Sequence, residues 1–245
     1  MSSVIVMTSG KGGTGKTSVT GGVGAALALM GRTVLCLDAD VGLRNLDITL
    51  GMADTALMDF SDVMAGRCPL ERAVAAHPSI PRLSLLTAPL DLPEDFSGEE
   101  GFRALLDEAR TMFDYVLIDS PAGLGTGSRL AACGADRAVV VTVSDPSSLR
   151  DAQRVVAELD RLETIGLVVN RVRPRLLRQM GQTIDDAMDT AGLPLLGLVP
   201  EDSRVQLAAA AGRPVAQLTD RGAARAYANI ARRLDGQQVP LSRIR

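Results

Sequence analysis

A glycine-rich stretch near the start of the chain constrains the fold more than any other feature. It reads GKGGTGKT at residues 10–17 and matches the pattern G-x-x-x-x-G-K-[ST]. The apolar residues 4–8 before it predict a buried strand, and residues 16–30 after it predict a helix that ends at Gly31. In this context the glycines let backbone N–H groups turn toward phosphate oxygens at a helix N-terminus. The stretch therefore predicts a phosphate-binding loop between a strand and a helix.

The rest of the chain alternates short apolar runs with segments of helical length. The runs are almost continuously apolar, which is typical of a parallel sheet covered by helices on both faces. Strands are predicted at residues 4–8, 33–37, 83–87, 115–118, 138–143, 165–169 and 195–199, and the main helices at 16–30, 102–113, 147–162, 176–191 and 222–234. We therefore predict an α/β fold: a single-domain, doubly wound, mainly parallel sheet over residues 1–245, with a short flexible C-terminal tail at 236–245.

Composition excludes several classes of protein. The net charge of -3 gives no global basic field for nucleic acid. Three widely spaced cysteines argue against a disulfide framework or a zinc site and favour a reducing cytoplasm. The single histidine, His77, precedes a proline, and we expect it in a surface loop and not in a catalytic triad. No apolar run reaches the roughly 18 residues that a membrane span needs.

Lysine is rare in this chain. Of the 26 Lys and Arg residues, only Lys11 and Lys16 are lysines, and both lie in the glycine-rich loop. Lys16 stands where a phosphate-loop lysine reaches the β- and γ-phosphates, and the Thr17 hydroxyl stands where it would ligate Mg²⁺. The general pattern does not require Lys11. Its ammonium is well placed to neutralise triphosphate charge, either in its own site or in that of a neighbouring molecule.

Carboxylates follow two of the predicted strands. Because the carboxyl ends of parallel strands meet at one edge of a sheet, we expect Asp38, Asp40 and Asp119 beside the phosphate loop. Asp119 fits the role of holding Mg²⁺ through a water. Of Asp38 and Asp40, one can lie near Mg²⁺ and the other can orient the attacking water. Gly123 and Gly125 predict a mobile loop after Asp119, as a γ-phosphate sensor requires.

Together these motifs resemble the MinD/ParA family of deviant Walker A P-loop ATPases, which belongs to the SIMIBI class, and within it the MinD-like members that determine septum sites. The stretches that carry the resemblance are SGKGGTGKTS (9–18), LDADVGLRNLDITLG (37–51), DSPAG (119–123) and VPEDSRV (199–205). It extends over about residues 4–234. It implies an ATP hydrolase that uses ATP and Mg²⁺, and an ATP-dependent homodimer.

The resemblance also implies roles for residues at the phosphates. Lys11 corresponds to a signature lysine that reaches the partner subunit's phosphates, and Asp151 to the interface aspartate that meets it. Asp40 corresponds to the residue that activates water, and Asn45 to a switch residue near that water. Mg²⁺ is assigned to Thr17, Asp38 and Asp119. The phosphate-binding set is Gly10, Lys11, Gly12, Gly13, Thr14, Gly15, Lys16, Thr17 and Ser18.

The adenine-binding elements implied by the resemblance are Asn170 and the segment Pro200, Glu201 and Asp202. From the residues alone, the carboxamide of Asn170 can match the N6/N7 edge of adenine. Spacing alone does not separate ATP from GTP, so ATP rests on the resemblance.

The function implied is a Mg-ATP-dependent dimerising switch that regulates division septum placement or spatial positioning, with a protein activator or effector. The alternative is a ParA-type partitioning or flagellar or pole-positioning ATPase, for which DNA binding by the basic residues 171–178 is the discriminating property. A metallocluster carrier needs a Cys-x-x-Cys that the chain lacks, and a non-hydrolysing nucleotide-binding regulator would not depend on Asp40.

The C-terminal tail bears on localisation. Pro240 interrupts helix formation there, and Val239, Leu241 and Ile244 make a small apolar face with Arg243 and Arg245 beside it. We expect a cytoplasmic protein with weak peripheral binding to the anionic inner face of the cell membrane when ATP is bound.

Overall fold

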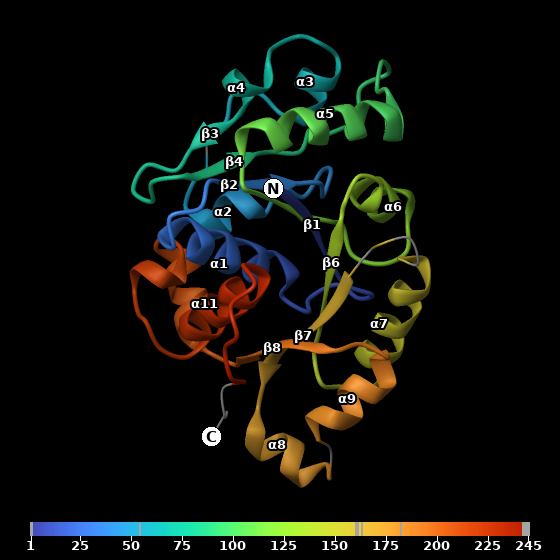
Figure 1. Ribbon diagram of the computed structural model, residues 1–245, viewed down its shortest axis with the longest axis vertical. Coiled ribbons are helices and arrows are strands. Elements are labelled where there is room, and N and C mark those ends of the chain that lie inside the picture. The colour runs from blue at the N-terminus through green and yellow to red at the C-terminus, as the bar shows by residue number, and fades with distance from the viewer. Residues whose placement is uncertain (1, 54, 160–161, 163, 182, 242–245) are drawn as a thin grey trace.

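Figure 1 shows the computed structural model, which describes residues 2–53, 55–159, 162, 164–181 and 183–241. Its described strands form one sheet in the order β3-β4-β2-β5-β1-β6-β7-β8. All neighbours pair in parallel except β3, which runs antiparallel to β4 at the edge. The bounds are β1 Ser3–Thr8, β2 Val34–Asp38, β3 Ala75–Ala76, β4 Leu83–Leu86, β5 Tyr115–Asp119, β6 Arg137–Thr142, β7 Thr164–Val172 and β8 Leu195–Pro200.

Helices cover both faces of this sheet. They are α1 Lys16–Leu29, α2 Leu46–Leu50, α3 Phe60–Met64, α4 Leu70–Ala73, α5 Gly98–Met112, α6 Thr126–Ala132, α7 Pro146–Glu158, α8 Pro174–Gln179, α9 Ile184–Ala191, α10 Ser203–Ala210 and α11 Ala223–Leu234, with a 3-10 turn η1 at Val215–Gln217. None of the described helices is long and apolar enough to cross a bilayer.

The core is split into two layers by the sheet. Val4 and Val6 of β1 pack into the layer beneath α3 to α9, whereas Ile5 and Met7 pack into the layer beneath α1, α2, α10 and α11. Figure 1 shows α1 and α11 on one side of the sheet and α6 and α7 on the other. Because successive side chains of a strand point to opposite faces, fully apolar strands serve both layers at once. The predicted doubly wound fold is confirmed.

The prediction of one helix over residues 176–191 is wrong. The structure forms two helices, α8 and α9, and Gly181 between them has a left-handed backbone with φ of 64°. Thr183 then starts α9 with a capping box, in which its hydroxyl accepts from the N–H of Asp186 and the Asp186 carboxylate accepts from the N–H of Thr183. A favourable cap and a glycine outweigh the continuous apolar pattern here.

His77 is buried, so the prediction of a surface histidine is also wrong. Its Nδ1 accepts from the backbone N–H groups of Ser79 and Ile80 at 3.1 and 3.0 Å, and its Nε2 lies 2.9 Å from the carbonyl of Leu50. Because Nδ1 is an acceptor, Nε2 carries the proton and donates to Leu50. The ring therefore fastens the turn after β3 to the end of α2.

The first part of the C-terminal tail is held against the body. Arg233 of α11 donates to the carbonyls of Val239 and Pro240, and also to Leu196 of β8. The remaining residues, 242–245, lie outside the described part of the chain, and so does the basic end of the predicted membrane-binding tail.

Candidate functional site

The phosphate loop, residues 9–15, joins the central strand β1 to α1. Gly13 and Gly15 have φ of 82° and 86°, a backbone region that favours glycine. A Cβ on Gly10 would lie 2.3 Å from the carbonyl oxygen of Asp151, so only glycine allows the loop to pack against α7. Gly13 and Gly15 are thus required for the shape of the loop, and Gly10 for its contact with a neighbouring helix.

Lys16 forms a buried ion pair with Asp119. Its Nζ lies 2.9 Å from Asp119 Oδ1, and the two side chains are 7% and 1% exposed. The hydroxyl of Thr20, one turn further along α1, lies 2.9 Å from the same carboxylate oxygen. The register of β5 places Asp119 beside Met7 of β1 and beside Asp38 of β2. The structure therefore brings together the predicted phosphate lysine and two predicted metal residues.

Asp38 shapes the segment that follows β2. Its two carboxylate oxygens accept from the backbone N–H groups of Asp40 and Leu46 at 2.9 and 3.1 Å. Burial, together with the negative charge of Asp119, raises the pKa of Asp38 to about 7. The two backbone hydrogen bonds lower the pKa of Asp38, but by less than burial and the Asp119 charge raise it. Asp38 is thus a buried carboxylate that positions residues 40–46 beside the phosphate loop.

Asp40 and Asn45 lie on this same segment with different surroundings. Asp40 is half-buried, and burial raises its pKa against the lowering effect of nearby Lys16. Asn45 is exposed at the start of α2 and makes no side-chain capping bond. Of the predicted catalytic residues, the structure therefore groups Asp40 with Lys16 and leaves the Asn45 side chain at the surface.

The donor set fits a magnesium ion held largely by water and phosphate. The Thr17 hydroxyl makes no hydrogen bond to any described residue, and Asp38 and Asp119 lie at the adjacent strand ends. Within the described residues there is no cluster of three or more His, Cys, Asp or Glu side chains that would hold a metal alone. Mg²⁺ in phosphate loops needs no such cluster, because it keeps several waters and binds phosphate oxygens.

Lys11 is exposed and rests on α7 of its own chain. Its Nζ donates to the Ser147 hydroxyl at 3.1 Å, and that hydroxyl donates to Asp145 at 2.6 Å. Although burial alone would raise the pKa of Asp145, hydrogen bonds from Ser147 and Ser148 and the charge of Lys11 lower it to about 2. The predicted interface residue Asp151 pairs with Arg154 at 3.4 Å.

Asn170 braces the phosphate loop. Its Nδ2 donates to the carbonyl of Thr14 at 2.8 Å, and both residues are buried. A Cβ on Gly15 would lie 2.4 Å from that nitrogen, which gives a second reason for glycine at this position. The Thr14 hydroxyl is itself buried and has no partner among the described residues. The Asn170 carboxamide, which we predicted to contact adenine, therefore donates its described hydrogen bond to the phosphate loop.

A cavity of about 440 Å³ adjoins this brace. It is lined by Ser18, Asn170, Arg171, Val199, Pro200, Glu201, Asp202, Ser203, Val205, Gln206, Ala209 and Tyr227. The four residues predicted to bind adenine all belong to this lining.

The two acidic side chains of this lining are already engaged in contacts within the protein. Glu201 forms a bidentate ion pair with Arg173, and Asp202 caps α10 and pairs with Arg204. The basic residues 171–178 therefore do not act as one cluster. The charge of Arg173 is paired with Glu201, whereas Arg171 lines the cavity.

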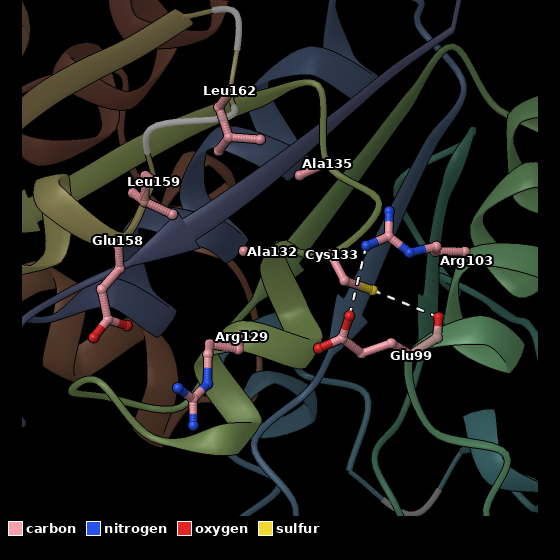
Figure 2. A pocket seen from close by; sticks show the side chains of 9 residues that line it. All are labelled: Glu99, Arg103, Arg129, Ala132, Cys133, Ala135, Glu158, Leu159 and Leu162. Carbon is pink, nitrogen blue, oxygen red and sulfur yellow. Dashed lines mark hydrogen bonds and ion pairs between the residues drawn. The ribbon is translucent and has the colours of Figure 1, made fainter.

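A larger cavity of about 550 Å³ lies between α5, α6 and α7, away from the phosphate loop. Figure 2 shows the Arg103–Glu99 ion pair and the contact of the Cys133 sulfur with the Glu99 carbonyl on its wall. Burial raises the pKa of the Cys133 thiol, so it remains protonated near neutral pH. None of the residues that the sequence predicted to bind nucleotide or metal or to act in catalysis is among its lining residues.

Comparison with known proteins identifies the family. The CobQ/CobB/MinD/ParA nucleotide binding domain matches residues 5–215. The chain belongs to this family. Septum site-determining protein MinD of Synechocystis is 39% identical over 98% of this chain and 92% of its own length, and MinD of Bacillus subtilis is 40% identical with the same coverage.

Solved MinD structures agree with the fold of this MinD-like chain. MinD in the MinC:MinD cell division complex of Aquifex aeolicus superimposes with a TM-score of 0.91 at 35% identity, covering 99% of both chains. MinD of Pyrococcus horikoshii in complex with Mg-ADP has a TM-score of 0.84 at 30% identity, covering 96% of both chains. The predicted family is confirmed, and with it a MinD-like ATPase that uses ATP and Mg²⁺.

Two contacts escaped the sequence analysis. Thr20 lies four residues after Lys16, a spacing that places both on one face of α1, so the helix pattern contained that signal. Ser147, the partner of Lys11, is 136 residues away along the chain, and no local pattern indicated it.

Proposed function

We propose that this MinD-like ATPase is an ATP-dependent dimerising switch that serves the placement of the division septum, as the names of its relatives suggest. In the dimer, Lys11 of each subunit completes the phosphate site of the other. The observation that carries the proposal is the exposure of Lys11 at the mouth of the loop. Among the described residues, its ammonium donates one hydrogen bond, to Ser147 at 3.1 Å. A solvent-exposed hydrogen bond of this kind adds little net stability, because water competes for both groups, so a partner's phosphates can displace it.

In the proposed site, each residue has a separate task. Lys16 leaves Asp119 to contact the β- and γ-phosphates, and backbone N–H groups of the loop hold the remaining oxygens. Thr17, Asp38 and Asp119 hold Mg²⁺, which neutralises the charge that develops on the phosphate oxygens. Asp40 orients the attacking water, and Asn45 lies near that water on the same segment.

The base is proposed to occupy the 440 Å³ cavity beside β8. Asn170 contacts its edge while its amide nitrogen holds Thr14, so that the base and the phosphate loop are positioned by one side chain. Pro200, Glu201 and Asp202 contribute backbone and apolar surface, because both acidic side chains are already paired with arginines.

Partners are proposed on the same basis. The Aquifex relative forms a complex with MinC, which supports a protein effector here as well. An anionic membrane surface on the cytoplasmic side, reached weakly through the tail, is the proposed location of the ATP-bound dimer.

The test is the molar mass in solution with ADP and with ATP. We expect a monomer with ADP and a dimer with ATP, and we expect Lys11→Ala to bind nucleotide but stay monomeric and lose turnover. Arg150→Ala, which removes another exposed cation near the same end of α7, is the matched control and should dimerise. Normal dimerisation and turnover by Lys11→Ala would show that the sandwich arrangement is wrong. Co-sedimentation of the ATP form with anionic vesicles, against salt-sensitive binding to DNA, separates a MinD-like from a ParA-like role.

A further inference from the structure

Thr20 is a fully buried hydroxyl at the centre of the phosphate site. It lies in α1 one turn after Lys16 and is 0% exposed. Its Oγ1 is 2.9 Å from Asp119 Oδ1 and 3.0 Å from the carbonyl of Lys16. No element of the loop motif requires a hydroxyl at this position.

The chemistry of the two acceptors favours the carboxylate. A threonine hydroxyl carries one hydrogen, and a charged acceptor forms a stronger hydrogen bond than a neutral carbonyl. The Lys16 carbonyl also receives the helical N–H that a residue four positions later supplies. Asp119, in contrast, is 1% exposed and depends on nearby side chains for its hydrogen bonds.

Asp119 Oδ1 is shared by two donors that behave differently. Lys16 Nζ and Thr20 Oγ1 both lie 2.9 Å from it. Under the proposed function, the flexible lysine turns from Asp119 to the phosphates when ATP binds. The hydroxyl of Thr20 is fixed by the helix and stays with Asp119.

We propose that Thr20 is a positioning residue that holds Asp119 for Mg²⁺ after Lys16 has moved to the phosphates. The inference rests on the proposed role of Asp119 at the metal. If Thr20 acts in this way, removing its hydroxyl weakens the binding of ATP that depends on Mg²⁺. The contacts of the loop with phosphate are unaffected.

The experiment measures ATP binding to the full chain over a range of MgCl₂ concentrations and in excess EDTA. Thr20→Val removes the hydroxyl and keeps the shape of the side chain, and Thr20→Ser restores the hydroxyl. Thr20→Ala is a second variant without the hydroxyl if valine disturbs the helix. Thr33→Val is the matched control, because it removes a hydroxyl that lies 2.9 Å from Asp114 at the opposite end of the sheet.

We expect Thr20→Val to raise the Mg²⁺ concentration needed for half-maximal ATP binding about tenfold, equivalent to about 1.4 kcal/mol. In excess EDTA, the affinity of Thr20→Val for ATP should stay within about twofold of the affinity of the unmodified protein. Thr20→Ser and Thr33→Val should both behave like the unmodified protein.

Three results would overturn the proposal. The Mg²⁺ dependence of Thr20→Val and Thr20→Ala could be unchanged, their affinity in EDTA could fall as much as that with Mg²⁺, or Thr33→Val could shift the Mg²⁺ dependence equally. If the unmodified protein bound ATP without any dependence on Mg²⁺, the proposed metal site itself would be wrong. These outcomes separate a failure of the Thr20 assignment from a failure of the proposed function.

Discussion

Replacing Asn170 by alanine tests whether this residue braces the phosphate loop or only reads the base. The change removes the donor that lies 2.8 Å from the Thr14 carbonyl. Asn170 and Thr14 are 4% and 3% exposed, so water has little access to replace the lost hydrogen bond. A buried carbonyl left without a partner costs about 1–3 kcal/mol. For a chain of this length, each kcal/mol lowers the melting temperature by about 2–4 °C.

The assay compares two ligands that differ in having a base. Under the proposed assignment of the base to the 440 Å³ cavity, pyrophosphate would contact the loop alone, whereas ADP would contact both the loop and the cavity. If Asn170 shapes the loop, its alanine variant binds pyrophosphate about tenfold more weakly, which corresponds to about 1.4 kcal/mol. Asn170→Asp should be worse, because it sets a carboxylate oxygen against the Thr14 carbonyl.

Gln206→Ala is the control, since Gln206 lines the same cavity and has no described contact with the loop. It should change ADP affinity at most slightly and leave pyrophosphate affinity and the melting temperature unaltered. If Asn170→Ala weakened ADP binding but left pyrophosphate binding and thermal stability intact, the bracing role would be refuted. Asn170 would then act on the base alone.

Two further predictions concern buried ionisable groups. Lys16→Ala should abolish productive ATP binding and also lower the free energy of unfolding by about 3–5 kcal/mol, because Asp119 loses a buried counter-charge. Arg32→Ala breaks an ion pair of equal length, but its arginine is 47% exposed, so water screens the pair and the loss measured by chemical denaturation should be much smaller. Equal losses in both variants would contradict the argument. Burial, opposed by the hydrogen bond to Leu50, keeps the pKa of His77 below its ordinary value, so the free energy of unfolding should fall as the pH decreases below about 6.5. Because His77 is the only histidine in the sequence, one imidazole signal in an NMR titration measures this pKa directly, and titration at or above 6.5 would refute it.

Much of the fold was predictable because its signals are local and strong. Each predicted strand is present, with ends displaced by up to three residues. A short, continuously apolar run is buried on both sides, and a strand in a parallel sheet covered by helices provides that burial. The edge strand β3 was missed because two alanines carry no strand pattern, and pairing with β4 alone makes them a strand. The break between α8 and α9 was missed because the apolar face continues across Gly181.

The sequence by itself determined the phosphate loop, the family and the edge of the sheet where the site lies. Glycines, Lys16 and Thr17 are contiguous, and the rule that strand ends meet at one edge placed Asp38 and Asp119 beside them. Only the tertiary structure decided how the charges are paired. The sharing of Asp119 between Lys16 and Thr20, the brace from Asn170 to Thr14 and the contact of Lys11 with Ser147 join residues 99 to 156 positions apart. Such pairings depend on packing distances of a few ångströms, which no local pattern of residues encodes.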